Sequence, residues 1–146
     1  MQRDLKAIVD GGIGGCLGTA TMSLLMLAGE EAGLMGGHPP KQIITKALDA
    51  MGMGGQSDGT ENALAVLMHF GFGVAAGSVF AVLHRRLPLR IPPAVHGIVF
   101  GGLVWGASYK GWIPALGIMP DPERDKLSRP EVMLVAHLIY GCTLGM

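Results

Sequence analysis

Charged side chains are scarce in this sequence, and the two signs cancel. Eleven Lys and Arg residues balance eleven Asp and Glu residues, and these four types make up only 15% of the 146 residues. A neutral chain offers no basic field for a phosphate backbone, so we exclude nucleic acid as a partner.

Cysteine is scarce too. Cys16 and Cys142 both lie in apolar stretches, and their spacing suits neither a disulfide framework nor a zinc site.

Recognised catalytic motifs are missing as well. The sequence contains no phosphate-cradling glycine loop, no CxxC pair and no Ser-His-Asp order of the kind that marks a hydrolase. We therefore predict no catalytic residue, and a non-enzymatic protein is the better interpretation.

Apolar residues and glycine dominate instead. Hydrophobic residues make up 49% of the chain, mean hydropathy is +0.43, and 24 Gly and ten Met residues are typical of closely packed membrane helices. We predict a single integral membrane domain over residues 1–146, an all-α bundle of four transmembrane helices with a short amphipathic helix in the first external loop. The predicted membrane helices are residues 8–35, 63–83, 94–109 and 130–146, and the amphipathic helix is residues 41–52.

Flanking charges predict the orientation of these helices. The connection at residues 84–93 carries three Arg and no acidic residue, so the positive-inside rule places it in the cytoplasm. Counting crossings from there puts both termini in the cytoplasm, and residues 36–62 and 110–130 outside. The chain is then two helical hairpins in tandem. At the cytoplasmic end, Asp10 and His96 are expected near one surface, where they can pair.

One pattern occurs twice in the chain. Histidine, two residues, an aromatic, glycine, three residues and glycine make up residues 69–77 and again residues 137–145. On a helix, this spacing puts each histidine in one column with its two glycines. The two helices run in the same direction, so a parallel pseudo-repeat is expected. Small residues at GxxxG-like spacing let helices approach closely, and the predicted packing positions are Gly14, Gly18, Gly73, Gly77, Gly97, Gly101, Gly102, Gly106, Gly141 and Gly145.

Ionisable side chains at membrane depth mark the candidate site. His69 and His137 each lie about 10 Å below the outer ends of their helices, so we expect them at one level. Glu30 and Glu31 lie near the outer end of the first helix, within reach of the same layer. An ionisable group at this depth is costly unless it is paired or hydrated, and is a functional hypothesis by default.

Three interpretations of Glu30, His69 and His137 stay open. The imidazoles can be neutral and hydrogen-bonded across helices, where they hold the bundle in register. Together with the carboxylate, they can instead face a hydrated cavity and relay protons or hold a metal ion. They can also ligate a b-type haem axially, with Gly73 and Gly141 making room for the porphyrin, although few aromatic residues are present to wall it.

Three parts of the chain carry a resemblance to a known family. They read M-S-L-L-M-L-A-G-E-E-A-G-L-M-G at residues 22–36 with H-P-P-K at 38–41, S-Y-K-G-W-I-P-A-L-G-I-M-P at 108–120, and A-H-L-I-Y-G at 136–141. In these segments the chain resembles the YagU-like family of small bacterial inner-membrane proteins of unknown function. The resemblance implies four membrane helices and a bacterial inner membrane, and it carries over no catalytic residue.

The function that these observations favour is that of a small non-enzymatic inner-membrane protein. It would be a membrane subunit or transport-like protein with an outer-leaflet site for protons or a metal ion, formed by Glu30, Glu31, His69 and His137. The alternatives are a bis-histidine haem b protein that transfers electrons and a purely structural subunit of a larger membrane complex. The expected partners are the lipid bilayer and either further copies of the chain or such a complex.

Overall fold

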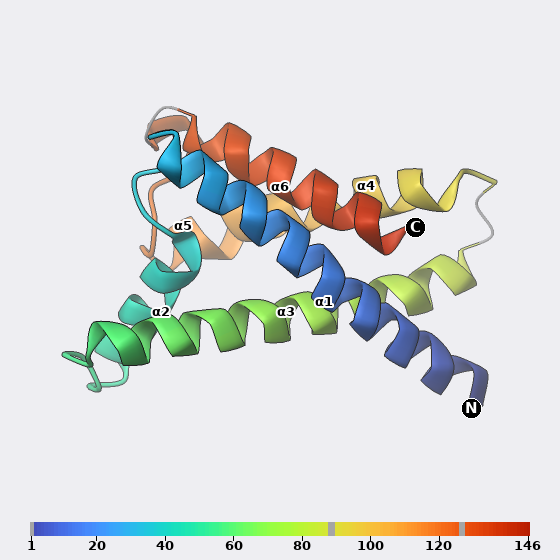
Figure 1. The fold of residues 1–146 in the computed structure, drawn as a ribbon, viewed down its shortest axis with the longest axis horizontal. Coiled ribbons are helices and arrows are strands. Elements are labelled where there is room, and N and C mark those ends of the chain that lie inside the picture. The colour runs from blue at the N-terminus through green and yellow to red at the C-terminus, as the bar shows by residue number, and fades with distance from the viewer. Residues whose placement is uncertain (1, 88–89, 126–127) are drawn as a thin grey trace.

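The structure, a computed structural model, describes residues 2–87, 90–125 and 128–146, and all regular elements of this part are helical (Figure 1). The predicted all-α class is confirmed. The elements are α1 (Gln2–Glu31), α2 (Pro39–Ala50), α3 (Asp58–Arg86), α4 (Pro93–Trp105), the π-helix η1 (Gly106–Trp112), α5 (Ile113–Ala115), the 3₁₀ turn η2 (Pro122–Arg124) and α6 (Arg129–Leu144). Residues 88–89 of the predicted arginine-rich connection and residues 126–127 of the predicted second external loop lie outside the described residues.

The two longest helices end where local chemistry stops them. α1 ends at Glu31 rather than at residue 35, because Gly33 takes a left-handed φ of 72° that breaks the helix. α3 begins at Asp58, five residues earlier than expected from hydropathy. Its first turn is capped by Ser57, whose hydroxyl oxygen accepts a hydrogen bond from the backbone N–H of Thr60 at 3.2 Å.

The four long helical segments pack as two hairpins. The most extensive contacts join α1 to α3 and α4 to α6, and contacts between α1 and α6 join one hairpin to the other. α3 makes little contact with α4 or α6. Figure 1 shows both termini at the same end of the molecule as the last turn of α3 and the first turn of α4, while α2 lies at the opposite end.

Both hairpins close at glycines. In four pairs, a Cβ added to the first residue would overlap the backbone carbonyl oxygen of the second, so the facing helices touch backbone to backbone. The pairs are Gly11 with Gly77, Gly15 with Gly73, Gly97 with Gly141, and Gly101 with His137. Since Gly73 and Gly141 occupy the same place in the repeated pattern, the two crossings use equivalent positions.

The other predicted packing glycines differ in how tightly they are enclosed. A Cβ added at Gly18 would overlap the ring of Tyr140, and a Cβ added at Gly145 would overlap the backbone of Pro93. At Gly14 and Gly102 the nearest leucine atoms lie 3.5 and 3.6 Å away, which is ordinary contact. At Gly106, nothing in the described part of the chain lies within 4 Å.

Apolar side chains cover much of the outer surface. Among the described residues, α1 and α3 are the two helices that are long and apolar enough to cross a membrane. Large apolar side chains also project outwards from α4, where Leu103 is 66% exposed, much as Leu24 of α1 and Leu67 of α3 are. A surface of this kind suits contact with lipid or protein better than contact with water.

The amphipathic helix α2 packs on the end of the bundle opposite to the termini. Its apolar side chains Ile44 and Leu48 are buried against Ala65 of α3. At its polar edge, Lys41 lies 2.7 Å from the carboxylate of Asp58. This hydrogen bond raises the pKa of Lys41. The helix is therefore held on α3 from both of its faces.

Candidate functional site

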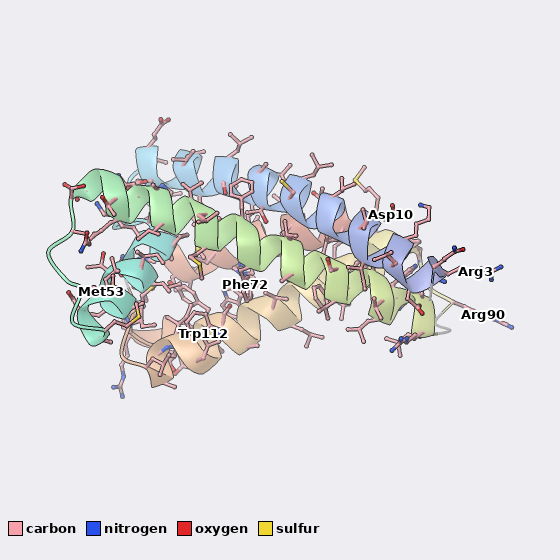
Figure 2. The ribbon with its side chains drawn as sticks, turned by 90° about the horizontal axis from the view of Figure 1, so that it is seen from below. Arg3, Asp10, Met53, Phe72, Arg90 and Trp112 are labelled. Atoms are coloured by element: carbon pink, nitrogen blue, oxygen red, sulfur yellow. The ribbon has the colours of Figure 1, made fainter. Side chains whose placement is uncertain are left out.

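A cavity of about 180 Å³ lies between α3 and η1, towards the end of the bundle that α2 covers. Met22 of α1 and Met133 of α6 are buried residues of its wall. Phe72 and Trp112 also line it and are 51% and 39% exposed. Figure 2 shows these two residues on neighbouring edges of α3 and η1. The cavity therefore extends from the core to the apolar outer surface.

His69 and His137 both line this cavity. The structure thus brings together the two histidines of the repeated pattern, from α3 and α6. Nδ1 of His137 donates a hydrogen bond of 2.7 Å to the carbonyl oxygen of Met133, one turn earlier in α6. A neutral imidazole that donates from Nδ1 has its lone pair on Nε2. For His69, Nε2 is buried and has no hydrogen-bond partner among the residues that the structure describes.

The hydroxyl groups around the cavity already donate to protein acceptors. Tyr140 donates to the carbonyl oxygen of Gly73 at 2.6 Å, which ties the second hairpin to the first. The other three are Thr19, which donates to Gly15, Ser108, which donates to Val104, and Tyr109, which donates to Asp125. These hydroxyls have therefore used their only donor and can offer a guest only acceptor lone pairs, whereas the two imidazoles add ring nitrogens that can still bond to a guest.

The two glutamates lie elsewhere. Glu30 pairs with His38, with 2.8 Å between the carboxylate Oε2 and the imidazole Nε2, and neither residue lines the cavity. Glu31 is exposed and does not line the cavity. Within the described residues, no group of three or more His, Cys, Asp and Glu side chains is placed to hold a metal ion. The structure therefore separates the predicted carboxylates from the predicted histidines.

The cavity wall opposite α3 is a π-helix. η1 contributes Ser108, Tyr109 and Trp112 to the lining, and Gly111 within it has a non-helical φ/ψ of −102° and −107°. Short π-helical segments inside α-helices are rare and are frequent at functional sites, because they change the direction in which side chains project. The sequence predicts a helix that ends at residue 109, and hydropathy contains no signal for this irregularity.

Comparison with known proteins gives one result for the whole chain. Residues 5–146 match the model of a family of unknown function, DUF6789. The chain belongs to the DUF6789 family. No curated protein and no solved structure matches it. The match agrees with the expected membership of a family of unknown function, but it does not extend to the YagU-like group or to a bacterial source.

A buried charge cluster in this DUF6789 protein was missed by sequence reasoning. Nη1 of Arg129 lies 3.2 Å from Oδ1 of Asp125, and their side chains are only 4% and 1% exposed. The hydroxyl of Tyr109, a residue of the cavity wall, donates to the second oxygen of the same carboxylate. Asp125 and Arg129 stand four residues apart, but they occur in a charged, proline-rich stretch that reads as a solvated loop.

At the other end of the bundle, the predicted pairing of Asp10 with His96 does not form. Asp10 pairs with Lys6, one turn earlier in α1. His96 instead faces His84 of α3, with 2.7 Å between their Nδ1 atoms. Since one nitrogen must donate and the other accept, this contact joins a protonated and an unprotonated Nδ1.

Proposed function

We propose that the chain is a small non-enzymatic protein that crosses the bacterial inner membrane four times. The helical segments α4, η1 and α5 follow one another over residues 93–115, with a kink at Gly111, and support the third crossing, since at about 1.5 Å per residue they reach at most about 34 Å. α6 has 16 residues, or about 24 Å, and would span with local thinning of the bilayer. The outward-facing leucines of α1, α3 and α4 then contact lipid.

Within this protein, the cavity between α3 and η1 is the functional site, and its function is to bind a small guest in the outer leaflet. The observation that carries this proposal is that His69 and His137 line a single, largely apolar cavity. Pockets of this composition, with few polar groups, bind small molecules. The two imidazoles are then hydrogen-bonding or proton-exchanging groups of a binding or transport-like site.

A metal ion and a haem fit the geometry of the histidines less well. A stable protein-bound metal ion usually has three or four protein ligands, and the carboxylate expected to join the imidazoles pairs with His38 instead. Pockets for drug-sized ligands measure roughly 300 Å³ or more. A haem is larger than such ligands, and this cavity measures only about 180 Å³. Axial ligation by both histidines would require the hairpins to separate.

Elemental and visible-spectral measurement of the purified protein tests the binding proposal against these alternatives. We expect no stoichiometric transition metal and no Soret band. A Soret band that disappears in both His69→Ala and His137→Ala would overturn the proposal and establish the haem protein in its place. Retention of the band in a His84→Ala control would show that the loss is specific to the cavity.

The proposed orientation predicts which cysteines react from outside. Residues 2–10 and 84–92 together carry five Lys and Arg but only two Asp and Glu, and Figure 2 shows Arg3 and Arg90 at one end with Met53 at the other. In a background without Cys16 and Cys142, we expect Ser57→Cys to react with a membrane-impermeant maleimide in intact spheroplasts. Leu87→Cys should react only after permeabilisation. The reverse pattern would invert the topology.

A further inference from the structure

We propose that the guest of the cavity is a monocyclic phenol, a single aromatic ring with a hydroxyl group, which enters from the bilayer between α3 and η1. This inference rests on the proposed binding function of the cavity and specifies its ligand class. Three properties of the described residues carry it. They are the size of the cavity, the chemistry of its apolar wall, and the hydrogen-bonding capacity of its two imidazoles.

Size limits the guest to one ring. Apolar protein cavities of about 150 Å³ bind benzene, so a cavity of about 180 Å³ accommodates one ring with a hydroxyl and a short substituent. Drug-sized and polycyclic ligands, which need roughly 300 Å³ or more, do not fit. A longer apolar substituent would have to extend past the exposed side chains of Phe72 and Trp112 into the bilayer.

The apolar wall favours an aromatic ring over a saturated one. Three methionines, Met22, Met68 and Met133, line the cavity, and thioether sulfur makes favourable contacts with aromatic rings. Phe72 and Trp112 add aromatic surface on the side that faces the bilayer, where ring-to-ring packing stabilises a guest beyond the area that it buries.

The polar atoms of the cavity favour a guest that carries a hydroxyl group. The tyrosine, serine and threonine hydroxyls of the wall donate to protein acceptors, as described above. His137, whose Nδ1 donates to Met133, accepts at Nε2, and Nε2 of His69 is buried without a partner among the described residues. A hydroxyl carries one donor and two lone pairs, so it can satisfy an imidazole in either tautomer. Benzene leaves both imidazoles unsatisfied, which is unfavourable in a low-dielectric site.

Access from the membrane is more open than access from the aqueous side. The first turn of α2 closes the outer end of the cavity with Pro39 and Pro40. α2 is held on α3 by the Lys41–Asp58 pair and by a hydrogen bond of 2.9 Å from Thr45 to Glu61. In contrast, α3 packs on α1 and makes little contact with α4. The boundary between α3 and η1 is therefore not closed by helix packing, and the exposed apolar side chains of Phe72 and Trp112 line it.

Methionine methyl NMR of the full chain in lipid nanodiscs tests the inference. Phenol, benzene and cyclohexanol are titrated and compared at equal mole fraction in the lipid. We expect phenol to shift the signals of the wall residues Met22 and Met133, while Met53 and Met146, which do not line the cavity, serve as internal controls. Phenol should bind about ten-fold more tightly than benzene, because of the hydrogen bond, and more tightly than cyclohexanol.

Variants separate hydroxyl recognition from cavity binding. Replacing both imidazoles, as in His69→Phe with His137→Phe, should bring phenol to within about two-fold of benzene, while the His84→Phe control keeps the ten-fold difference. Equal affinities of the native chain for phenol and benzene would overturn the phenol assignment and leave the cavity proposal standing. Absence of any Met22 or Met133 shift with all three probes would overturn both. The comparison in the native chain does not depend on whether a variant folds.

Discussion

Gly101→Ala is expected to destabilise the protein by about 3 kcal/mol, at the upper end of the usual range for overpacking. The new Cβ would overlap the carbonyl oxygen of His137 and lie 3.2 Å from the Cα of Gly141. Both obstacles are backbone, so α4 and α6 have to move apart and lose contact along the whole hairpin. We expect the loss in the free energy of unfolding, measured by denaturant titration in mild detergent.

The neighbouring residue provides a matched control. A Cβ on Gly102 would meet only the Leu138 side chain, at 3.6 Å, and alanine favours a helix interior over glycine by roughly 0.5–1 kcal/mol. Gly102→Ala should therefore be neutral or slightly stabilising. If the two variants unfold at the same denaturant concentration, close backbone contact at Gly101 is not what holds the second hairpin together. Since Gly101 faces the backbone of His137, Gly101→Ala should also disturb the cavity.

Asp125→Asn is expected to cost about 3–5 kcal/mol of stability, because it leaves the guanidinium of Arg129 buried without its counter-charge. The carboxylate bonds both Arg129 and Tyr109, so it joins the segment before α6 to the π-helical wall of the cavity. Thermal unfolding of the purified protein in detergent measures the effect.

Two comparisons distinguish a buried ion pair from a general effect of removing charge. Glu123 makes an exposed pair with Lys110 at 3.8 Å, so Glu123→Gln should change stability by less than about 1 kcal/mol. Replacing both partners, as in Asp125→Leu with Arg129→Met, should recover much of the loss, because no unpaired charge remains. An Asp125→Asn variant as stable as Glu123→Gln would show that the buried pair contributes nothing.

The sequence by itself determined the helical class and the approximate helix positions, and it singled out the two histidines that line one cavity. Hydropathy marks long apolar stretches directly, and the rise per residue converts sequence position into depth along a helix. The repeated histidine and glycine pattern also located the contact faces of α3 and α6, since a spacing of four keeps residues on one side of a helix.

The tertiary structure decided which groups meet. Sequence position places Glu30 near the end of α1, but only the path after α1 brings His38, rather than His69, to its carboxylate. Likewise, Asp125 and Arg129 read as solvated until the fold buries them against Tyr109. Sequence pattern assigns a residue to a face of its own helix. Which helix covers that face, and whether a cavity remains between them, depends on packing between distant segments.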